Sequence, residues 1–501
     1  NDTTTELRIP IGRTGATKLQ YLAIGKGTRQ HALFAGKTGS GKSTLFHVII
    51  TNLALACSPD QVEFYLIDFK KGVEFKCYAT HRLPHARVVA IESDREFGLS
   101  VLHRVDEELR RRGDMFRSLG VQDIAGYKRA GGSEPMPRTL LAIDEFQEFF
   151  VEDDQIAQNA SLLFDRIVRQ GRAFGIHVLL GSQTLGGAYT LARATLGQMV
   201  IRVALQCNEA DAYLIMDDNN PAPRLLSRPG EGIYNDSAGA IEGNSPFQVV
   251  WLPDDERDAQ LRRVQALAKE AGTQRSGPFV FEGNAPADIR ENFLLPAMLA
   301  GHSGEKRDPH CWLGAPNAIK GPTEAVFRRQ SGANLLVVGQ RSEAIRTMLA
   351  LAVISLAARQ GGDAARIVVF QTGAGENPDF LDQVVTALSN RITVAHNNNL
   401  PQVMNELAAE LASRTADESL DAGPVFVLIP ELQRFKRLRH EEDYSFSSSP
   451  DQEASPAGQF ATLMTEGAGV GIHLIVTLDT FSNVGRYLSR RALSEFSLRV
   501  V

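Results

Sequence analysis

The sequence predicts an α/β protein of two tandem domains, each built on a mostly parallel sheet with flanking helices. Three observations support this prediction: alternating strand-like and helix-like segments, an internal repeat, and a glycine-rich loop between a strand and a helix. The alternation is visible in the apolar runs HALFAG (31–36) and TLLAID (139–144), each followed by a helical segment. Such an order predicts parallel strands with helices on both faces of the sheet.

The internal repeat consists of five segments of the second half that match segments of the first half in the same order. The matched pairs are 9–25 with 311–327, 31–44 with 334–347, 139–149 with 425–435, 175–184 with 471–480, and 200–203 with 497–500. The second copy ends directly after its last match, so it is either truncated or simply shorter than the first. We therefore predict a first domain at 1–254, a linker and connecting helix at 255–304, and a second domain at 305–501.

The chain has 501 residues, of which 43% are hydrophobic and 22% charged, and its net charge is −6. This is an ordinary globular composition without a basic signature, so any contact with nucleic acid would depend on a local patch. The four cysteines lack metal-ligand spacing, and no apolar run approaches the roughly 18–20 residues of a membrane span. We expect a cytoplasmic protein. Because the sequence begins at Asn1, we also expect a fragment or processed form, with membrane association only through regions outside it.

Residues 36–43, GKTGSGKS, carry the pattern GxxxxGK[ST] between an apolar strand and a helix. Glycines allow successive backbone N–H groups to converge on phosphate oxygens, and the helix N-terminus adds a positive dipole. Lys42 is placed to reach the terminal phosphates, and the Ser43 hydroxyl to complete a magnesium shell. The predicted nucleotide-binding residues are Gly36, Lys37, Thr38, Gly39, Ser40, Gly41, Lys42, Ser43 and Thr44, with ATP and Mg²⁺ as cofactors.

Two carboxylates, Asp144 and Glu145, end the apolar strand 140–143. Adjacent strand residues point to opposite sides, so the two groups can act differently. Asp144 is the predicted magnesium ligand together with Ser43, and Glu145 is the predicted base that orients and deprotonates the attacking water. Gln183, at the end of the strand 178–182, is a candidate sensor of the γ-phosphate. A lone glutamine in that place is more often an ordinary polar residue at a strand end.

An arginine from a neighbouring subunit would stabilise the charge that develops on the transferred phosphate. Arg166, Arg169 and Arg172 lie on one helix, where a solvated basic face is at least as good an interpretation. Arg202 lies in an otherwise apolar strand, and we predict it as the catalytic arginine.

A further acidic strand end occurs in LIDFKKGVEF (66–75), where Asp68 follows an apolar run. Its carboxylate can share the magnesium environment or carry a signal to the loop beyond. Lys70 and Lys71 in that loop are also consistent with ordinary surface lysines. The residues around 70–76, or the stretch 186–195, are candidates to face a channel, with plain surface loops as the alternative.

Together these motifs resemble the motor domain of the FtsK/SpoIIIE family of ring ATPases, from about residue 7 to residue 253. The motifs that carry the resemblance are GKTGSGKST, LIDFKKG, RLPH (82–85), residues 111–129, LLAIDEFQEF, RAFGIHVLLGSQ and RPGEGIYND (228–236). The resemblance implies RecA-like P-loop NTPase domains that hydrolyse ATP at the loop and the two carboxylates described above. It also implies a ring, typically a hexamer, that threads a polymer through its pore.

The resemblance leaves the polymer open. Some family members move double-stranded DNA, whereas EccC-like ATPases of type VII secretion carry several such domains in one chain and act on protein. Two features are similar to the secretion branch. One is the tandem arrangement with a damaged second domain, and the other is LIDFKKG, which has no proline after its aspartate. The basic loops suit sequence-independent contacts with a DNA backbone, and on balance we predict a translocase of double-stranded DNA. A nucleotide-switched assembly scaffold is the third interpretation.

The loop of the second copy, GQRSEAIR (339–346), keeps the spacing of the first loop but not its chemistry. Ile345 replaces the phosphate-binding lysine, Arg346 replaces the serine, and Pro430 stands in place of the magnesium aspartate. These losses predict a degenerate second domain that no longer hydrolyses ATP. We expect it to pack, to supply contacts to neighbouring subunits, and to regulate the first domain.

Overall fold

The computed structural model divides into two compact units, of which the first comprises residues 1–285 with 317–319, and the second 286–316 with 320–501. It describes residues 2–501 except 71–73, 185–192, 218, 274–276, 284, 286, 293, 301–307, 359–364, 373–377, 418–421 and 440–454. Among the helices of the described residues, none combines the length and apolar character that a membrane crossing requires.

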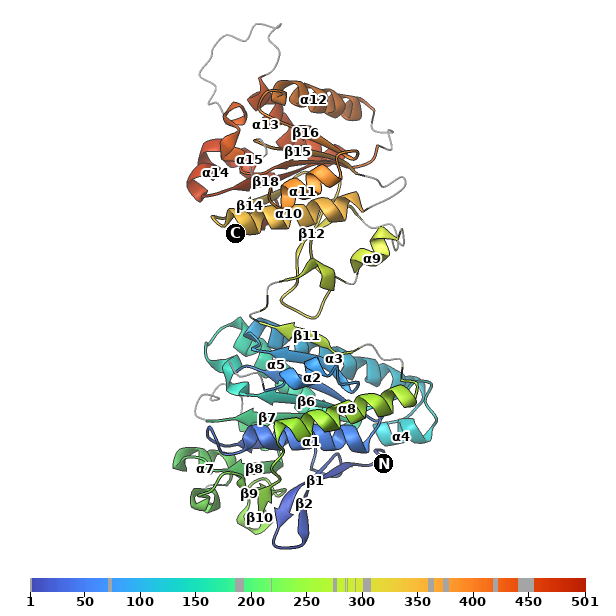
Figure 1. Ribbon diagram of the computed structural model, residues 1–501, viewed down its shortest axis with the longest axis vertical. Coiled ribbons are helices and arrows are strands. Elements are labelled where there is room, and N and C mark those ends of the chain that lie inside the picture. Colours follow the sequence, from blue (N-terminus) through green and yellow to red (C-terminus); the bar gives the residue numbers. More distant parts are fainter. Residues whose placement is uncertain are drawn as a thin grey trace. The chain divides into compact units, whose positions relative to one another are not determined.

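The first unit is built on one 11-stranded sheet, whose central strands are parallel (Figure 1). Across the sheet the strands are β11 (Phe279–Glu282), β5 (Ala86–Ile91), β4 (Val62–Asp68), β6 (Arg138–Asp144), β7 (Ile176–Ser182), β3 (Ala32–Ala35), β8 (Ile201–Leu205), β9 (Glu231–Asn235), β10 (Asn244–Val249), β1 (Leu7–Thr14) and β2 (Lys18–Ile24). Strands β3, β4, β6 and β7 are buried along their whole length, as expected for parallel strands covered on both faces. From β8 to β2 the strands pair antiparallel.

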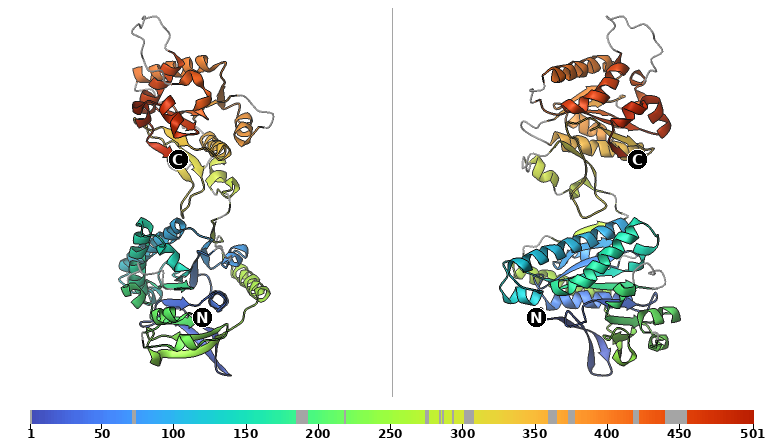
Figure 2. Two further views of the ribbon diagram at one scale, coloured as in Figure 1. Left: turned by 90° about the vertical axis from the view of Figure 1, so that its left-hand side faces the viewer. Right: turned by 180° about the vertical axis from the view of Figure 1, so that it is seen from behind.

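Helices cover both faces of this sheet (Figure 2). One layer consists of α1 (Lys42–Ala56) and α8 (Asp254–Glu270), and the other of α3 (Arg95–Ser118) and α5 (Gln155–Phe174), which pack against each other. The shorter helices are α2 (Lys76–Thr80), α4 (Ile124–Arg129), α6 (Arg193–Gly197) and α7 (Glu209–Ile215), with 3₁₀ turns η1 (Phe146–Phe150), η2 (Ala222–Leu225) and η3 (Ile241–Gly243). Aspartates cap the two long helices: Asp94 accepts a bond from Phe97 N, and Asp154 from Ala157 N.

The segment 255–285 does not form the linker that its polar composition predicts, because it packs on the first unit. Helix α8 packs against α1 and buries Leu261, Val264 and Ala268, an apolar stripe at helical spacing. Leu261 and Val264 belong to the same hydrophobic core as α1. Strand β11 then extends the sheet by pairing in parallel with β5. Residues 255–285 are therefore part of the first unit, because a narrow stripe on a charged helix is sufficient to dock it.

The second unit repeats the parallel core of the first. Its 6-stranded sheet has the order β16 (Ile392–Ala395), β15 (Arg366–Phe370), β17 (Val425–Ile429), β18 (Ile472–Leu478), β14 (Leu335–Val338) and β19 (Leu498–Val500), all paired in parallel. This order corresponds strand for strand to β5, β4, β6, β7, β3 and β8. The predicted fold class, α/β with mainly parallel sheets flanked by helices, is confirmed.

Helices also cover both faces of the second sheet. One face carries α10 (Ser342–Ala357) and α11 (Phe380–Ala387), and the other α12 (Leu400–Ala416) and α13 (Pro456–Glu466). The remaining elements are the hairpin β12 (His310–Gly314) and β13 (Thr323–Val326), helices α9 (Leu294–Leu299), α14 (Phe481–Tyr487) and α15 (Arg490–Ser494), and 3₁₀ turns η4 (Ile289–Glu291), η6 (Leu432–Arg434), η7 (Lys436–Leu438) and η8 (Gly467–Val470).

The two units also share backbone details. His177 and His473 are the second residues of matching strands, and each ring pairs with a buried carbonyl, of Gln30 and of Ala333. Glu145 and Glu431, which follow matching strands, both adopt a left-handed backbone, with φ of 56° and 52°. These shared features show that the repeat seen in the sequence is a repeat of structure.

Candidate nucleotide-binding site

The glycine-rich loop connects the end of β3 to the first turn of α1. Gly39 and Gly41 have φ of 78° and 99°, values that favour glycine over any residue with a Cβ atom. A Cβ at Gly41 would also lie 3.3 Å from the Cα of Gly230. The spacing of these glycines therefore follows from the path of the loop.

Neighbouring strands hold the two ends of this loop. Gly36 N donates to Ser182 O at 3.2 Å and Lys37 N to Gln206 O at 2.8 Å, at the ends of β7 and β8. On the other side, Gly230 N donates to Ser40 O at 2.8 Å. The loop is thus anchored to the carboxyl edge of the parallel strands, where α/β proteins bind ligands.

Lys42 lies at the centre of the site and is 5% exposed. Its ammonium forms ion pairs with Asp144 and with Glu145, the latter with Nζ to Oε1 at 2.6 Å. Burial raises the pKa of the Asp144 carboxyl, although Lys42 opposes this shift. Three of the predicted site residues therefore meet in one buried cluster.

The Glu145 carboxylate is oriented by groups on its other side. Its Oε2 accepts hydrogen bonds from Gln147 Nε2 at 2.7 Å and from the backbone N–H of Gln183 at 2.9 Å. Burial raises the pKa of Glu145, but Lys42 and these two donors outweigh burial and leave the pKa below its usual value. Glu145 is therefore ionised at neutral pH, as a general base must be.

Ser43 makes a contact that the sequence analysis does not foresee. Its hydroxyl donates to Glu74 Oε1 at 2.9 Å, and the other Glu74 oxygen lies 3.7 Å from His47 Nε2 on the next turn of α1. The bond to His47 and the one from Ser43 lower the pKa of Glu74, against burial, which raises it. Glu74 belongs to the LIDFKKGVEF segment, but nothing in that motif predicts its contact with Ser43.

Asp68, at the end of β4, is fully buried beside Asp144 in the sheet. Its two oxygens accept backbone hydrogen bonds from Lys70 at 2.9 Å and Glu74 at 3.2 Å. Burial raises the pKa of Asp68 to about 7, with repulsion from Asp144 adding to the shift. The carboxyl therefore holds the backbone of both Lys70 and Glu74. Lys71 lies outside the described residues, as do 186–192.

A pocket of about 490 Å³ opens in front of the loop, a size typical of sites for small ligands. Its predicted lining residues are Lys37, Thr38, Gly39, Gly41, Lys42, Ser43, Thr44 and Gln183, and further lining residues are Lys70, Glu74, Pro229, Gly230, Gln248, Val249, Val250 and Trp251. Thr38 Oγ1 donates to Gln183 Oε1 at 2.9 Å, which links the loop to the candidate sensor. The segment 248–251 carries no recognisable motif, so only the fold shows that it reaches the site.

The arginines lie in other surroundings. Arg202 donates from Nη1 to Ile215 O at 2.9 Å and from Nε to Met199 O at 3.2 Å, and burial lowers its pKa. It would have to give up these bonds to reach a nucleotide of a neighbouring subunit. Arg166 pairs with Asp106 on α3 at 2.9 Å. The trans arginine stays a prediction.

The corresponding loop of the second unit keeps its backbone anchor but has Ile345 in place of the phosphate-binding lysine. Gly339 N donates to Leu478 O at 3.0 Å, as Gly36 does to Ser182 in the first unit. Arg346 forms ion pairs with Asp379 and with Asp382, the latter at 2.9 Å. An arginine held by two aspartates therefore lies where the first unit has Ser43.

The donor set of the first unit fits a nucleoside triphosphate with magnesium. The glycine loop provides backbone donors and Lys42 a cation for phosphates, while Ser43 and Asp144 provide the hard oxygen ligands that Mg²⁺ prefers. The loop between β3 and α1, with an acidic strand end one strand away on β6, defines a P-loop nucleoside triphosphatase.

Comparison with known proteins specifies the class further. Residues 3–186 match the FtsK/SpoIIIE family, which confirms the predicted resemblance of this region. The ESX-5 secretion system protein EccC5 of Mycobacterium marinum is 33% identical over 261 residues, 49% of this chain and 18% of that protein. The DNA translocase FtsK of Streptococcus agalactiae is 28% identical over 276 residues, 53% of this chain and 31% of that protein.

Solved structures resemble both units. The cytoplasmic domain of the type VII secretion ATPase EccC of Thermomonospora curvata gives a TM-score of 0.64 at 20% identity, covering 98% of this chain and 59% of that one. ATPases 2 and 3 of the same protein, in complex with a signal sequence peptide, give 0.61 at 18% identity, covering 98% and 85%. At these identities the likeness concerns the fold. The chain spans less than a third of the length of the EccC5 and FtsK relatives named above.

Proposed function

We propose that this chain is an ATP-hydrolysing motor module whose first unit is catalytic. The observation that carries the proposal is the buried cluster in which Lys42 of the loop contacts both Asp144 and Glu145. Lysine and the two acids are the groups that bind terminal phosphates, hold magnesium and activate water. The match of this region to FtsK/SpoIIIE ATPases supports the same conclusion.

Each residue of the site has a defined task in this proposal. The loop 36–41 and Lys42 bind the phosphates, and Ser43 and Asp144 hold Mg²⁺, which neutralises phosphate charge when bound. Glu145 accepts the proton of the attacking water, since Gln147 and Gln183 orient its carboxylate. Gln183 also bonds Thr38, so it is placed to report changes at the loop.

The second unit is a degenerate copy in this proposal. A phosphate would need to displace Arg346 from two aspartates, and the unit offers Ile345 and Pro430 where the first has a lysine and an aspartate. We infer that it contributes to a ring of subunits in the cytoplasm, a hexamer by analogy with the family.

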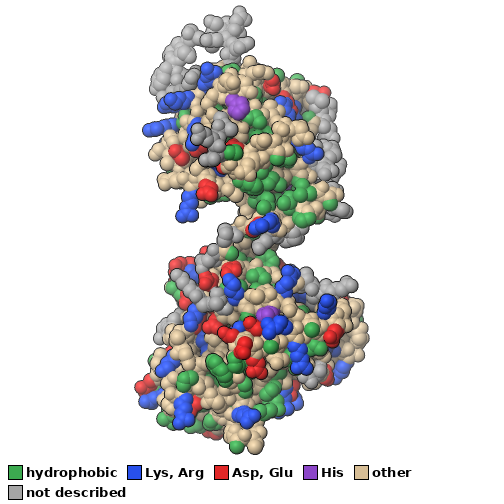
Figure 3. Space-filling model, viewed as in Figure 1, with side chains coloured by type: hydrophobic (Ala, Val, Ile, Leu, Met, Phe, Trp, Pro, Cys, Tyr) green, Lys and Arg blue, Asp and Glu red, His purple; other side chains and the backbone are tan. Residues whose placement is uncertain are grey.

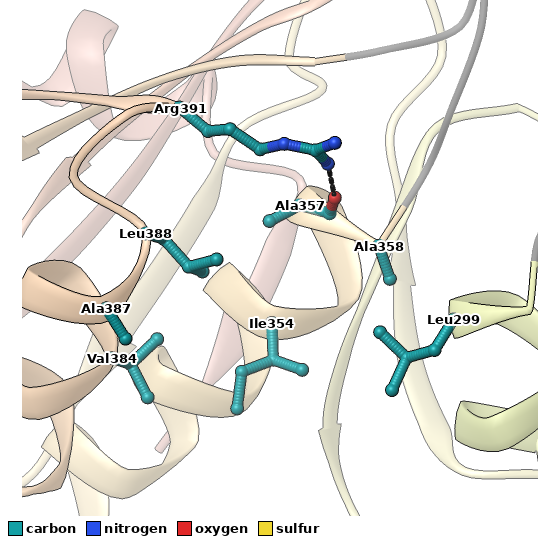
Figure 4. A pocket seen from close by; sticks show the side chains of 8 residues that line it. All are labelled: Leu299, Ile354, Ala357, Ala358, Val384, Ala387, Leu388 and Arg391. Carbon is teal, nitrogen blue, oxygen red and sulfur yellow. Dashed lines mark hydrogen bonds between the residues drawn. The ribbon is translucent and has the colours of Figure 1, made fainter.

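For the polymer we favour a polypeptide, as in protein export, over the DNA that the sequence favours on balance. The tandem fold supports this choice, because secretion ATPases with this arrangement resemble nearly the whole chain. The second unit also has an apolar pocket of about 410 Å³ (Figure 4). It is lined by Leu299, Ile354, Ala357, Ala358, Val384, Ala387, Leu388 and Arg391. Such a lining suits apolar side chains of a peptide.

Double-stranded DNA is the second candidate, supported by the FtsK relatives. Against it, acidic and basic side chains intermingle on the face shown in Figure 3, and the net charge is −6. DNA binding is dominated by contacts of basic side chains with phosphates, so a basic stripe would be expected. A nucleotide-switched scaffold remains the third candidate, supported by the single intact site.

The experiment measures ATP hydrolysis by the purified chain alone, with duplex DNA, and with peptides from the C-terminal ends of proteins encoded beside it. We expect Lys42→Ala to abolish hydrolysis, whereas Lys18→Ala, at an exposed residue that begins β2, leaves the rate unchanged. Stimulation by a peptide supports export and stimulation by DNA supports the second candidate. Full activity of Lys42→Ala would refute the proposed function.

A further inference from the structure

Trp251 is the most unusual side chain of the nucleotide pocket. It is 75% exposed, although its indole is the largest apolar group in the lining, and the adjacent Val250 is 45% exposed. The chain has only two tryptophans, and the other, Trp312, is 1% exposed in the second unit. A solvated indole in a pocket wall is typical of a group that stacks on a ligand.

The backbone fixes Trp251 relative to the phosphate-binding loop. Val249 N donates to Gly230 O, and Gly230 N donates to Ser40 O, both at 2.8 Å. Strand β10, which ends at Val249, pairs with β9 and β1, so the segment that follows it starts from a rigid sheet. Two short backbone links therefore connect the residues preceding the indole with the loop that holds the phosphates.

The wall around Trp251 is mostly apolar. Pro229, Val249 and Val250 line it, and Gln248 is the polar side chain on the same strand end. The Gln248 amide donates to Pro229 O at 3.2 Å, so it already has a backbone partner. Lys42 and the other phosphate-binding groups line the same pocket. Its lining therefore combines charged and polar groups that suit phosphates with apolar groups that suit a flat ring.

We propose that Trp251, with Val250 and Pro229, is the stacking platform for the base of the bound nucleotide. The proposal rests on the proposed function of this site as a nucleotide site. Stacking recognises the area of an aromatic face and not its hydrogen-bonding edge. The site therefore prefers purine over pyrimidine nucleotides and discriminates weakly between adenine and guanine.

The test compares ligands with and without a base. Dissociation constants for ATP, GTP, CTP and inorganic tripolyphosphate, each with Mg²⁺, are measured by calorimetry on the whole chain. We expect Trp251→Ala to weaken ATP and GTP by about five- to a hundredfold, the range of base–aromatic stacking. Tripolyphosphate, which has no base, changes less than twofold. Trp251→Phe keeps most of the affinity, and ATP quenches the tryptophan emission of the wild type but not of this variant.

Leu225→Ala is the matched control, because it truncates an apolar side chain that is 83% exposed on η2, outside the pocket lining. It leaves all four constants unchanged. Unchanged ATP binding by Trp251→Ala overturns the platform, and so does an equal loss for ATP and tripolyphosphate, which would mean that Trp251 supports the loop. CTP binding as tightly as ATP overturns it too. If the wild type binds neither ATP nor tripolyphosphate, the nucleotide site itself is refuted and the platform with it.

Discussion

The exchange Glu145→Gln separates binding from hydrolysis at this site. Glutamine has the shape of glutamate, so its carbonyl oxygen can still accept the bonds from Gln147 and Gln183, both shorter than 3 Å in the wild type. Its amide can no longer pair with Lys42 or accept a proton. Loss of a general base lowers rates by about 10²–10⁴-fold, which corresponds to about 3–5 kcal/mol of activation free energy. We expect kcat for ATP to fall by this factor.

The affinity for ATP should increase or stay unchanged, in contrast to the fall in kcat. Glu145 is one of two carboxylates that compete with phosphate for the Lys42 ammonium, so its neutralisation frees charge for the ligand. We expect the dissociation constant of ATP to fall or to stay within about threefold of the wild-type value. The assay is steady-state phosphate release together with calorimetric ATP binding.

Glu148→Gln is the matched control, since Glu148 lies on the same turn, η1, outside the cluster. We expect its kcat to stay within about twofold of the wild type. If Glu145→Gln hydrolyses ATP within threefold of the wild type, Glu145 is not the base. If instead ATP binding is lost, the cluster serves binding and the assignment of roles is wrong.

Three further predictions concern stability and pH. Arg112→Ala should lower the unfolding free energy by about 3–5 kcal/mol. The reason is that Arg112 is fully buried and donates to the Thr139 side chain at 2.8 Å and to Phe174 O at 2.7 Å. In the same denaturant titration Arg117→Ala, at an 80% exposed pair on the same helix, should cost less than about 1 kcal/mol. Asp68 binds its proton more tightly when folded, with a pKa of about 7 against 3.8, so its ionisation costs stability progressively as the pH rises from about 4 to 7. The unfolding free energy of the wild type relative to Asp68→Asn should therefore fall across that window and be level above it; a flat difference would contradict the raised pKa. Arg346→Ala should lower the unfolding temperature of the second unit, measured by calorimetry, while ATP hydrolysis by the first unit continues.

Local patterns were sufficient to predict the part of the site that lies on continuous motifs. The glycine loop, Lys42 and the acidic end of β6 were expected to lie together because of their residue types, their spacing and the strand–loop–helix context, and the structure brings them together. The strand alternation and the repeat likewise predicted the parallel cores of both units. These features need only short stretches of sequence.

The missed residues depend on how distant segments meet. Glu74 reaches Ser43 over 31 residues because both follow strands that end at the same edge of the sheet. Trp251 follows β10, which belongs to the antiparallel part of the sheet from β8 to β2. No sequence motif predicts the pairing of these strands, so none predicts that Trp251 lies at the pocket. The sequence predicts a linker at helix α8 because most of its residues are charged or polar, and only three apolar residues of the helix are buried. In each case tertiary packing decided a role that composition could not.

In both units a side-chain contact connects the helix after the glycine loop, α1 or α10, with the residues near the start of the next helix, α2 or α11, but the contact differs between the units. In the first, the Ser43 hydroxyl donates one hydrogen bond to Glu74, which precedes the helix that follows β4. In the second, Arg346 spans the same place with bonds to Asp379 and Asp382, at the start of the helix that follows β15. A neutral hydroxyl with one partner can exchange it for a metal ion, whereas a guanidinium with two carboxylates is strongly held in place.

Under the proposed function, this difference explains how the second unit keeps its fold without a nucleotide site. In the first unit the link between the loop helix and the neighbouring turn includes Ser43, a predicted magnesium ligand, so it can respond to the nucleotide. In the second unit the ion pairs of Arg346 make that link from the protein's own side chains, independent of any ligand. Gly339 keeps its bond to Leu478 and Glu431 its left-handed backbone, so the loop retains its path although Ile345 stands in place of the lysine. Under the proposed function, the second unit is thereby suited to keep one structure while the first unit passes through its nucleotide states.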